Sequence, residues 1–309
     1  MSDRTCAPIV LFVYNRLGHT QRTVEALQKN HLATESDLIV YADGAKRSED
    51  EEKVSAVRNY VHAIVGFRSV EVRESSVNKG LANSIIAGVT AVIGVHGRAI
   101  IIEDDLVTSP FFLTFMNDGL DMYADDPRVS CVHGFVYPVR EKIDRPFFLR
   151  GADCWGWATW KRAWECFEQD GEKLYRELVA RKLTDAFDYD GVFPSMEVLR
   201  DQVAKKVDSW AIRWAASAFL KEMFVLYPNE NLVHNIGIDG SGTHCTPADP
   251  EVLPLATNRI ILRKEKVGVR SKIVRMLKRR YSISVYPKWV SAVACFVRNS
   301  IGRMRRKES

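Results

Sequence analysis

Strand-like and helix-like segments alternate along the first third of this 309-residue chain, and this alternation limits the possible folds more than any other feature. The strand-like segments are short apolar runs, typical of strands buried on both faces. Strands are expected at residues 8–14, 37–42, 69–73 and 98–102, and helices at 18–30, 48–65 and 81–95. Ser48 and Glu51 predict a capping box at the second helix. Helical crossovers between strands predict an α/β fold with a mostly parallel central sheet.

The second part of the chain carries longer helical segments and fewer strands. Ser109-Pro110 is expected to open a helix, and further strands are expected at 129–135 and 223–227. A helix is expected at 208–222, capped by Ser209 or Asp208. We expect one interwoven unit over residues 1–250, in two halves of residues 1–108 and 109–250. Residues 251–309 would form a basic amphipathic extension.

Charge is distributed unevenly along the chain. Residues 261–309 carry 15 Lys and Arg against 2 Asp and Glu, while the rest has a slight acidic excess. A basic helix with a tryptophan at its border, here Trp289, is typical of segments that lie on an anionic membrane. Nucleic-acid binding is the rival use of this charge, without a motif to support it, and a packed helical extension is the third interpretation.

Compartment and membrane signals are few. Six cysteines without a close pair indicate reduced thiols. The apolar runs are too short to span a bilayer, and the first residues lack the apolar core of a signal peptide. The expected location is the cytoplasm, with peripheral attachment to the inner face of the membrane as an option.

Polar residues follow each expected strand of the first third. Ligands of parallel sheets bind beyond the carboxyl ends of the strands, so these residues are the site candidates. They are Asn15-Arg16, Asp43-Gly44, Asn78-Lys79-Gly80 and Glu103-Asp104-Asp105. The glycine patterns of phosphate-binding loops and of dinucleotide-binding enzymes are absent.

The acidic triplet Glu103-Asp104-Asp105 is the strongest of these signals. Adjacent carboxylates repel one another unless a cation neutralises them, and their oxygens suit Mg²⁺ or Mn²⁺. The alternative is a solvated acidic turn before the next helix. Asp43 is suited to a base or ribose, or simply belongs to an Asp-Gly turn, and Lys79 at a helix start is suited to a nucleotide phosphate.

Four of the seven tryptophans lie between residues 155 and 164. Trp155 and Trp157 flank a glycine and are candidates for stacking on sugar rings, with core packing as the alternative. Trp160 and Trp164 are four residues apart, which favours the core for both. Asp153, just before them, is a further candidate acid.

The strand-end motifs together resemble those of glycosyltransferases with the GT-A fold, the nucleotide-diphospho-sugar transferase fold. The matching segments are Tyr14-Asn15-Arg16, Tyr41-Ala42-Asp43-Gly44, Asn78-Lys79-Gly80-Leu81 and Ile102-Glu103-Asp104-Asp105. The last matches the acidic metal motif Asp-x-Asp in a Glu-Asp-Asp form. Similarity to N-acetylglucosaminyltransferase I and related bacterial enzymes extends to Ser109-Pro110-Phe111-Phe112, Trp155-Gly156-Trp157 and Asp208-Ser209-Trp210, and covers residues 7–245.

The resemblance implies that residues 1–250 form a catalytic domain, with a nucleotide-sugar-binding half (1–108) and an acceptor half (109–250). It also implies a role for each matching residue. Arg16 and Asp43 would hold the nucleobase and ribose, and Asp104 would lie near the ribose or donor sugar. Asp208 would be the catalytic base that deprotonates the acceptor hydroxyl, unless it only caps its helix. The full candidate set is Asn15, Arg16, Asp43, Lys79, Glu103 and Asp104 for the donor, Asp105 and His244 for Mn²⁺ or Mg²⁺, Asp208 for catalysis, and Trp155, Trp157 and Trp210 for the acceptor.

The sequence therefore predicts a metal-dependent, inverting glycosyltransferase of cell-surface glycan synthesis. It would move a hexose or N-acetylhexosamine from a nucleotide sugar, a UDP-sugar by preference, to a saccharide or lipid-linked saccharide. The alternatives are a sugar nucleotidyltransferase and a non-catalytic glycan- or membrane-binding protein on the same fold.

Overall fold

The computed structural model describes residues 5–237 and 253–281, and its centre is an eight-stranded sheet. Across the sheet the strands are β3 (Ser69–Glu74), β2 (Asp37–Ala42), β1 (Ile9–Val13), β4 (Arg98–Glu103), β8 (Trp157–Trp160), β6 (Val129–His133), β9 (Phe224–Tyr227) and β7 (Phe147–Arg150). Six strands run in one direction, and only β8 and β7 run against them. The predicted α/β class with a mostly parallel sheet is confirmed.

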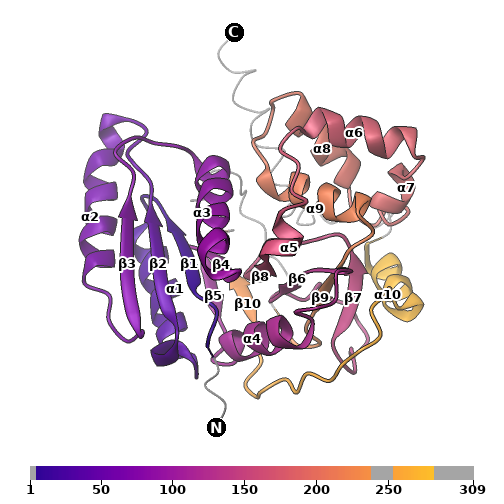
Figure 1. Ribbon diagram of the computed structural model, residues 1–309, viewed down its shortest axis with the longest axis horizontal. Coiled ribbons are helices and arrows are strands. Elements are labelled where there is room, and N and C mark those ends of the chain that lie inside the picture. Colours follow the sequence, from indigo (N-terminus) through magenta and orange to yellow (C-terminus); the bar gives the residue numbers. More distant parts are fainter. Residues whose placement is uncertain (1–4, 238–252, 282–309) are drawn as a thin grey trace.

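The helices divide between the two halves of the chain. The crossovers of the first half are α1 (Leu17–Gln28), α2 (Glu51–His62) and α3 (Leu81–His96), with the short helices η1 (Ala33–Glu35) and η2 (Ser48–Asp50). The second half contributes α4 (Phe112–Met122), α5 (Lys161–Trp164), α6 (Gly171–Ala180), α7 (Thr184–Phe187), α8 (Ser195–Val203) and α9 (Trp210–Leu220). Figure 1 shows α6, α7 and α8 gathered into a helical lobe at one end of the second half.

A second sheet, of two strands, begins directly after the acidic triplet. Strand β5 (Leu106–Thr108) follows the triplet directly and pairs antiparallel with β10 (Val233–Asn235). Asn235 lies opposite Leu106 in this ladder. The residues after Asn235 are therefore carried to the end of β4.

Several local predictions of element ends failed. The helix expected to open at Ser109-Pro110 begins at Phe112, without a side-chain cap. The capping box of Ser48 and Glu51 is wrong, because Ser48 lies in η2 and no side chain caps α2. The carboxylate of Asp50, the residue before α2, accepts hydrogen bonds from Tyr14 and Asn15 instead. The strand expected at 129–135 ends at His133.

Residues 253–281 pack on the body of the protein. They end in α10 (Ser271–Tyr281), which buries Ile273, Met276, Leu277 and Tyr281 in the main core. The Tyr281 hydroxyl donates to the carbonyl of Pro138 at 2.8 Å. The described part of the basic extension thus buries its apolar face, and its predicted part around Trp289 lies outside the described residues. Within residues 5–237 and 253–281, no helix is both long and apolar enough to cross a membrane.

Helix α3 packs so closely on the sheet that one of its glycines has no room for a side chain. A Cβ on Gly88 would lie 2.8 Å from the ring of Phe12, which is itself buried and stacked on Tyr41. A Cβ on Gly94, in the same helix, would meet nothing within 4 Å.

Gly88→Ala and Gly94→Ala should therefore have opposite effects on the free energy of unfolding. Alanine favours a helix interior by about 1 kcal/mol over glycine, so Gly94→Ala should stabilise the chain. Gly88→Ala should destabilise it by about 1–3 kcal/mol, the usual cost of overpacking. Urea unfolding of both variants measures the difference. A stabilised Gly88→Ala variant would mean that α3 does not pack against Phe12 as described.

Candidate active site

The acidic triplet lies at the carboxyl end of β4, near the middle of the large sheet. Strand β4 is buried between β1 and β8, and Glu103 lies opposite Phe12 of β1. Asp104 and Asp105 form the turn to β5, and Asp104 is 5% exposed. Asp104 and Asp105 thus form a turn, but the alternative of a solvated turn is wrong, because the triplet is largely withdrawn from water.

Arg16 lies directly against the triplet. The residue follows β1, and its Nη2 donates to both Asp104 Oδ1 and Asp105 Oδ2, the latter at 2.8 Å. The Thr23 hydroxyl of α1 donates to the backbone carbonyl of Asp104 at 2.8 Å. Arg16 was predicted to hold a nucleobase, but its guanidinium is engaged by carboxylates 88 and 89 residues further along the chain.

Burial dominates the electrostatics of the triplet. It raises the pKa of Asp104 to about 6, although the charge of Arg16 opposes this shift. Burial, together with the charges of Asp105 and Asp104, raises the pKa of Glu103 well above its ordinary value. The Oδ2 atom of Asp104 is buried without a hydrogen-bond partner in the described part of the chain. A buried carboxylate oxygen of this kind is costly unless something unseen contacts it.

This orphaned oxygen is what a divalent cation would satisfy. Hard cations take carboxylate oxygens, and Mg²⁺ in particular uses one or two carboxylates plus phosphate oxygens and water. Asp104 and Asp105 supply such a donor set. Residues 5–237 and 253–281 contain no cluster of three or more potential ligand side chains, and His244, the predicted additional ligand, lies outside them.

Residues 235–237 close one side of the triplet, which the sequence did not indicate. The Ile236 amide donates to the Asp105 carbonyl at 2.8 Å, and the His19 ring contacts the Ile236 carbonyl at 3.3 Å. A Cβ on Gly237 would overlap the carboxylate of Asp105. Gly237 thus allows the chain to approach Asp105 closely, just before the segment that contains His244.

Asp43 organises two loops at the carboxyl edge. Its carboxylate accepts hydrogen bonds from the amides of Gly44, Lys79 and Gly80, each at 2.9 Å, and from the Asn78 side chain at 3.1 Å. These contacts leave the 8% exposed Asp43 little capacity for a ribose. They also hold the exposed Lys79 just before α3, and its contact with a phosphate stays a prediction.

Asn15 is likewise engaged within the protein. Its Nδ2 donates to Asp50 Oδ1 at 3.1 Å, and the neighbouring Tyr14 hydroxyl donates to Asp50 Oδ2 at 3.2 Å. Asp50 is 7% exposed. These bonds fasten the segment after β2 to the end of β1, and the donor contact of Asn15 stays a prediction.

Two of the three tryptophans assigned to the acceptor are fully buried. Trp157 and Trp210 are both 0% exposed, and their rings stack with centroids 5.5 Å apart. Trp164 and Trp214 complete this indole cluster. A sugar cannot stack on a covered ring, so the assignment of Trp157 and Trp210 to acceptor stacking is wrong and the core alternative holds.

Trp155 is the tryptophan of this group that remains partly exposed. Its amide donates to His133 Nε2 at 2.9 Å, and its ring meets Phe135 edge-on at 4.8 Å. His133 ends β6 and is fully buried, which lowers its pKa. Trp155 therefore stands at the carboxyl edge of the sheet on a fixed backbone.

The indole cluster also places Asp208. Trp157 lies opposite both Ile101 of β4 and His133 of β6, so the stacked Trp210 brings the start of α9 over the carboxyl edge. Ser209 caps α9 by accepting from the Ile212 amide. The cap interpretation of Asp208 is thus wrong. Its side chain is 65% exposed and contacts the buried Arg213 through Oδ1 at 3.2 Å.

Asp153 is the centre of a polar cluster that sequence reasoning identified only in part. Its Oδ2 accepts from the hydroxyls of Tyr137 and Tyr227, both at 2.7 Å, and its Oδ1 from the Cys154 amide at 2.8 Å. Tyr227 ends β9, and burial raises the pKa of both tyrosines well above their ordinary value. The one feature of the sequence that could have pointed to this cluster is that Tyr227, like His133, lies at the end of a strand.

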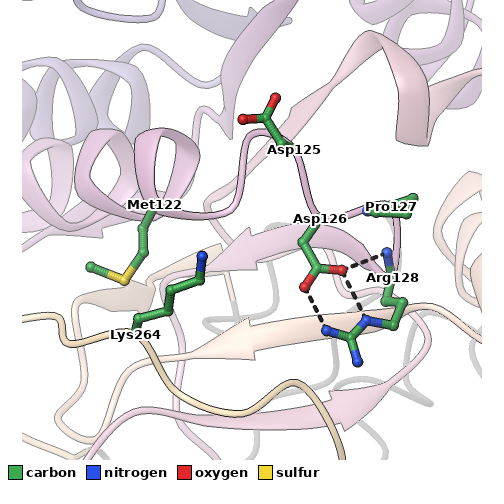
Figure 2. Close-up of a pocket in the computed structure, with 6 residues that line it drawn as sticks. All are labelled: Met122, Asp125, Asp126, Pro127, Arg128 and Lys264. Atoms are coloured by element: carbon green, nitrogen blue, oxygen red, sulfur yellow. Dashed lines mark hydrogen bonds and ion pairs between the residues drawn. The ribbon is translucent and has the colours of Figure 1, made fainter.

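The depression of about 370 Å³ shown in Figure 2 is not part of this site. Its lining residues are Met122, Asp125, Asp126, Pro127, Arg128 and Lys264. They include the turn directly before β6, at the amino end of a strand parallel to β4. The depression therefore lies at the opposite edge of the sheet from the acidic triplet.

Comparison with known proteins adds little to this geometry. No family model and no curated protein matches the chain. Among solved structures, the mannosyltransferase PcManGT from Pyrobaculum calidifontis, in complex with GDP-Man and Mn²⁺, is 16% identical with a TM-score of 0.35, and the match covers 45% of this chain and 37% of that one. TarS of S. aureus is 11% identical with a TM-score of 0.41, over 74% of this chain and 36% of that one.

An apo UDP-glucose pyrophosphorylase is also similar, at 11% identity and a TM-score of 0.37, over 75% of this chain and 93% of that one. The chain spans little more than a third of the length of the first two proteins. Likenesses this distant decide nothing about activity. The resemblance to N-acetylglucosaminyltransferase I stays a prediction, and function has to be inferred from the site residues.

The Asp43 contacts generate a prediction about stability. Asp43→Asn replaces one acceptor oxygen with an amide group that can only donate, next to backbone amides that also donate. The variant should destabilise the chain by about 1–3 kcal/mol, because buried donors lose their acceptor. Asp37→Asn, at the other end of β2, is the matched control. The partly exposed Asp37 carboxylate pairs with Arg68 and accepts from the Ser69 hydroxyl at 2.6 Å, so its replacement should cost about 1 kcal/mol or less. Urea unfolding compares the two, and equal effects would contradict the organising role of Asp43.

Proposed function

We propose that this chain is a nucleotide-sugar glycosyltransferase of the GT-A type that uses Mn²⁺ or Mg²⁺ and inverts the anomeric carbon. The observation that carries the proposal is the acidic triplet at the end of β4, where Asp104 Oδ2 is buried without a hydrogen-bond partner among the described residues. The largely exposed carboxylate of Asp208, just before α9, supports a base on the acceptor side. A cation site and a separate carboxylate are what sugar transfer requires.

The donor would bind across the carboxyl ends of β1, β2, β3 and β4. Asp104 and Asp105 would hold the cation, with His244 as a further ligand. A bound divalent cation supplies neutralising charge to the departing nucleoside diphosphate. Lys79, exposed at the start of α3, is suited to a phosphate oxygen. Glu103 would face the donor sugar, and Asn15 and Asp43 would shape the pocket through the loops they fasten.

The acceptor would lie between α9 and Trp155. Asp208 would take the proton from the acceptor hydroxyl as its oxygen attacks the anomeric carbon. The contact of Oδ1 with Arg213 fixes the direction of this carboxylate. A single base on the acceptor side implies direct displacement and therefore inversion. Trp155, with Phe135 beside it, offers an aromatic surface for a saccharide ring.

The positive charge of residues 261–309 supports an anionic membrane surface, and with it a lipid-linked acceptor, as a partner. Because α10 buries its apolar residues on the body of the protein, this helix would contribute to membrane binding through its charge alone. Such binding would weaken with salt.

A sugar nucleotidyltransferase is the second candidate on this fold. Such an enzyme would need a glycine-rich loop with basic residues directly after β1 to bind a triphosphate, and the segment Asn15-Arg16-Leu17-Gly18 matches that pattern poorly. The two activities differ in their products. Release of nucleoside diphosphate from a nucleotide sugar indicates transfer, whereas formation of nucleoside triphosphate from nucleotide sugar and pyrophosphate indicates nucleotidyl transfer.

A thermal-shift panel of nucleotide sugars, with and without Mn²⁺, tests the donor assignment. A ligand present at 100 times its dissociation constant should stabilise the fold by about 2.7 kcal/mol. Stabilisation that needs both the nucleotide sugar and Mn²⁺ supports the proposal. A panel without any stabilised combination contradicts it.

Asp105→Ala should abolish transfer and the Mn²⁺ dependence of donor binding while leaving the fold intact. The reason is that the variant removes a metal-binding carboxylate from a turn rather than an apolar side chain from the core. Donor titration with and without Mn²⁺ measures the effect, and circular dichroism checks the fold. Unchanged Mn²⁺ dependence would show that Asp105 does not hold the cation.

Asp208→Asn should lower turnover about 10²-fold or more, the usual scale for losing a general base, with little change in donor affinity. Ser209→Ala is the control, because it removes the cap of α9. It should cost about 1 kcal/mol of stability without a comparable loss of turnover. Steady-state kinetics and unfolding of both variants separate the roles, and near-normal turnover in Asp208→Asn would exclude Asp208 as the base.

A further inference from the structure

The guanidinium of Arg16 lies where a cation shared by Asp104 and Asp105 would lie. A single nitrogen, Nη2, contacts Asp104 Oδ1 and Asp105 Oδ2. The three side chains are 21%, 7% and 15% exposed, so water screens this contact only partly. The same carboxylates are the metal ligands of the proposed function.

A divalent cation and this guanidinium cannot occupy the same place. Both are positive, and both need the oxygens that face the gap between the two carboxylates. Arg16 Nη2 contacts Asp104 Oδ1 and Asp105 Oδ2, the two oxygens that face this gap. The buried Asp104 Oδ2 has no partner among the described residues, and this one oxygen is too few to hold a metal ion alone. Metal binding in the gap between the two carboxylates therefore requires Arg16 to move away.

We infer that Arg16 is an internal counter-cation that a divalent metal must displace, so that competition with Arg16 sets the metal affinity of the free chain. This inference rests on the metal site of the proposed function. In the free chain Arg16 neutralises a buried cluster that would otherwise repel itself. Once displaced, its planar fork matches phosphate oxygens, which a nucleotide diphosphate beside the metal would provide.

Displacement of Arg16 couples the binding of the metal to the binding of the nucleotide. Without a nucleotide, the displaced guanidinium loses two carboxylates and gains only water. With a nucleotide diphosphate present, it gains new anionic partners. Metal and nucleotide should therefore strengthen one another's binding, by an equal factor in each direction as linkage requires.

The test is Mn²⁺ binding to the full chain at pH 8 without nucleotide, followed by the electron paramagnetic resonance signal of free Mn²⁺. Arg16→Gln removes the competing charge and should bind Mn²⁺ about tenfold more tightly than the unmodified chain, or more, as expected for loss of a partly buried ion pair. Arg22→Gln is the matched control. It removes the same charge from an exposed position of α1 and should change the affinity little.

Arg16→Lys is a second variant for the case that Arg16→Gln folds poorly. It keeps a positive charge near the triplet. Its affinity for Mn²⁺ should fall between those of Arg16→Gln and the unmodified chain. Equal or weaker Mn²⁺ binding by folded Arg16→Gln overturns the inference while leaving the proposed metal site in place. Absence of Mn²⁺ binding by all four chains overturns the inference together with that metal site.

Discussion

The ion pairs of Arg16 with Asp104 and Asp105 hold the central edge of this protein together. Three consecutive acids at the end of a buried strand repel one another and lose hydration, and burial raises the pKa of Asp104 to about 6 even against the opposing charge of Arg16. The parallel pairing of β1 with β4 places Phe12 opposite Glu103, which brings Arg16 to the height of the following acids. The same strand pairing that builds the sheet therefore supplies the charge that lets the triplet stay buried.

The second half of the site depends on packing rather than on charge. The indole cluster of Trp157, Trp164, Trp210 and Trp214 joins β8, α5 and α9. Its rings are large and close-packed, so they fix the start of α9 relative to the ends of β4 and β6. Asp208, which directly precedes the cap residue of α9, owes its position to this cluster. The tryptophans thus serve the proposed acceptor side indirectly, by positioning the helix.

The acids at the carboxyl edge divide by how fully their oxygens are satisfied. Asp43, Asp50 and Asp153 each accept several hydrogen bonds from protein groups, and each fastens one loop to another. Asp208 is largely exposed, and Asp104 keeps one oxygen without a partner in the described part of the chain. A carboxylate whose acceptor sites are filled contributes to architecture, and one with capacity left is available for a ligand or a proton.

The sequence by itself determined the fold class and the edge of the sheet at which the candidate residues gather. Apolar runs alternating with helical periods leave few arrangements other than a parallel sheet with crossovers, and parallel strands end on the same side. The triplet and Lys79 could be placed at this edge because they follow strands, whereas Asp208 was proposed only through the resemblance of Asp208-Ser209-Trp210. Only the tertiary structure decided what each side chain contacts. Arg16 meets Asp104 across 88 residues, Asp43 turns inward to amides of another loop, and Trp157 and Trp210 cover one another. Such contacts join segments far apart in the chain, and local propensity and periodicity carry no information about which distant groups compete for the same carboxylate or the same ring.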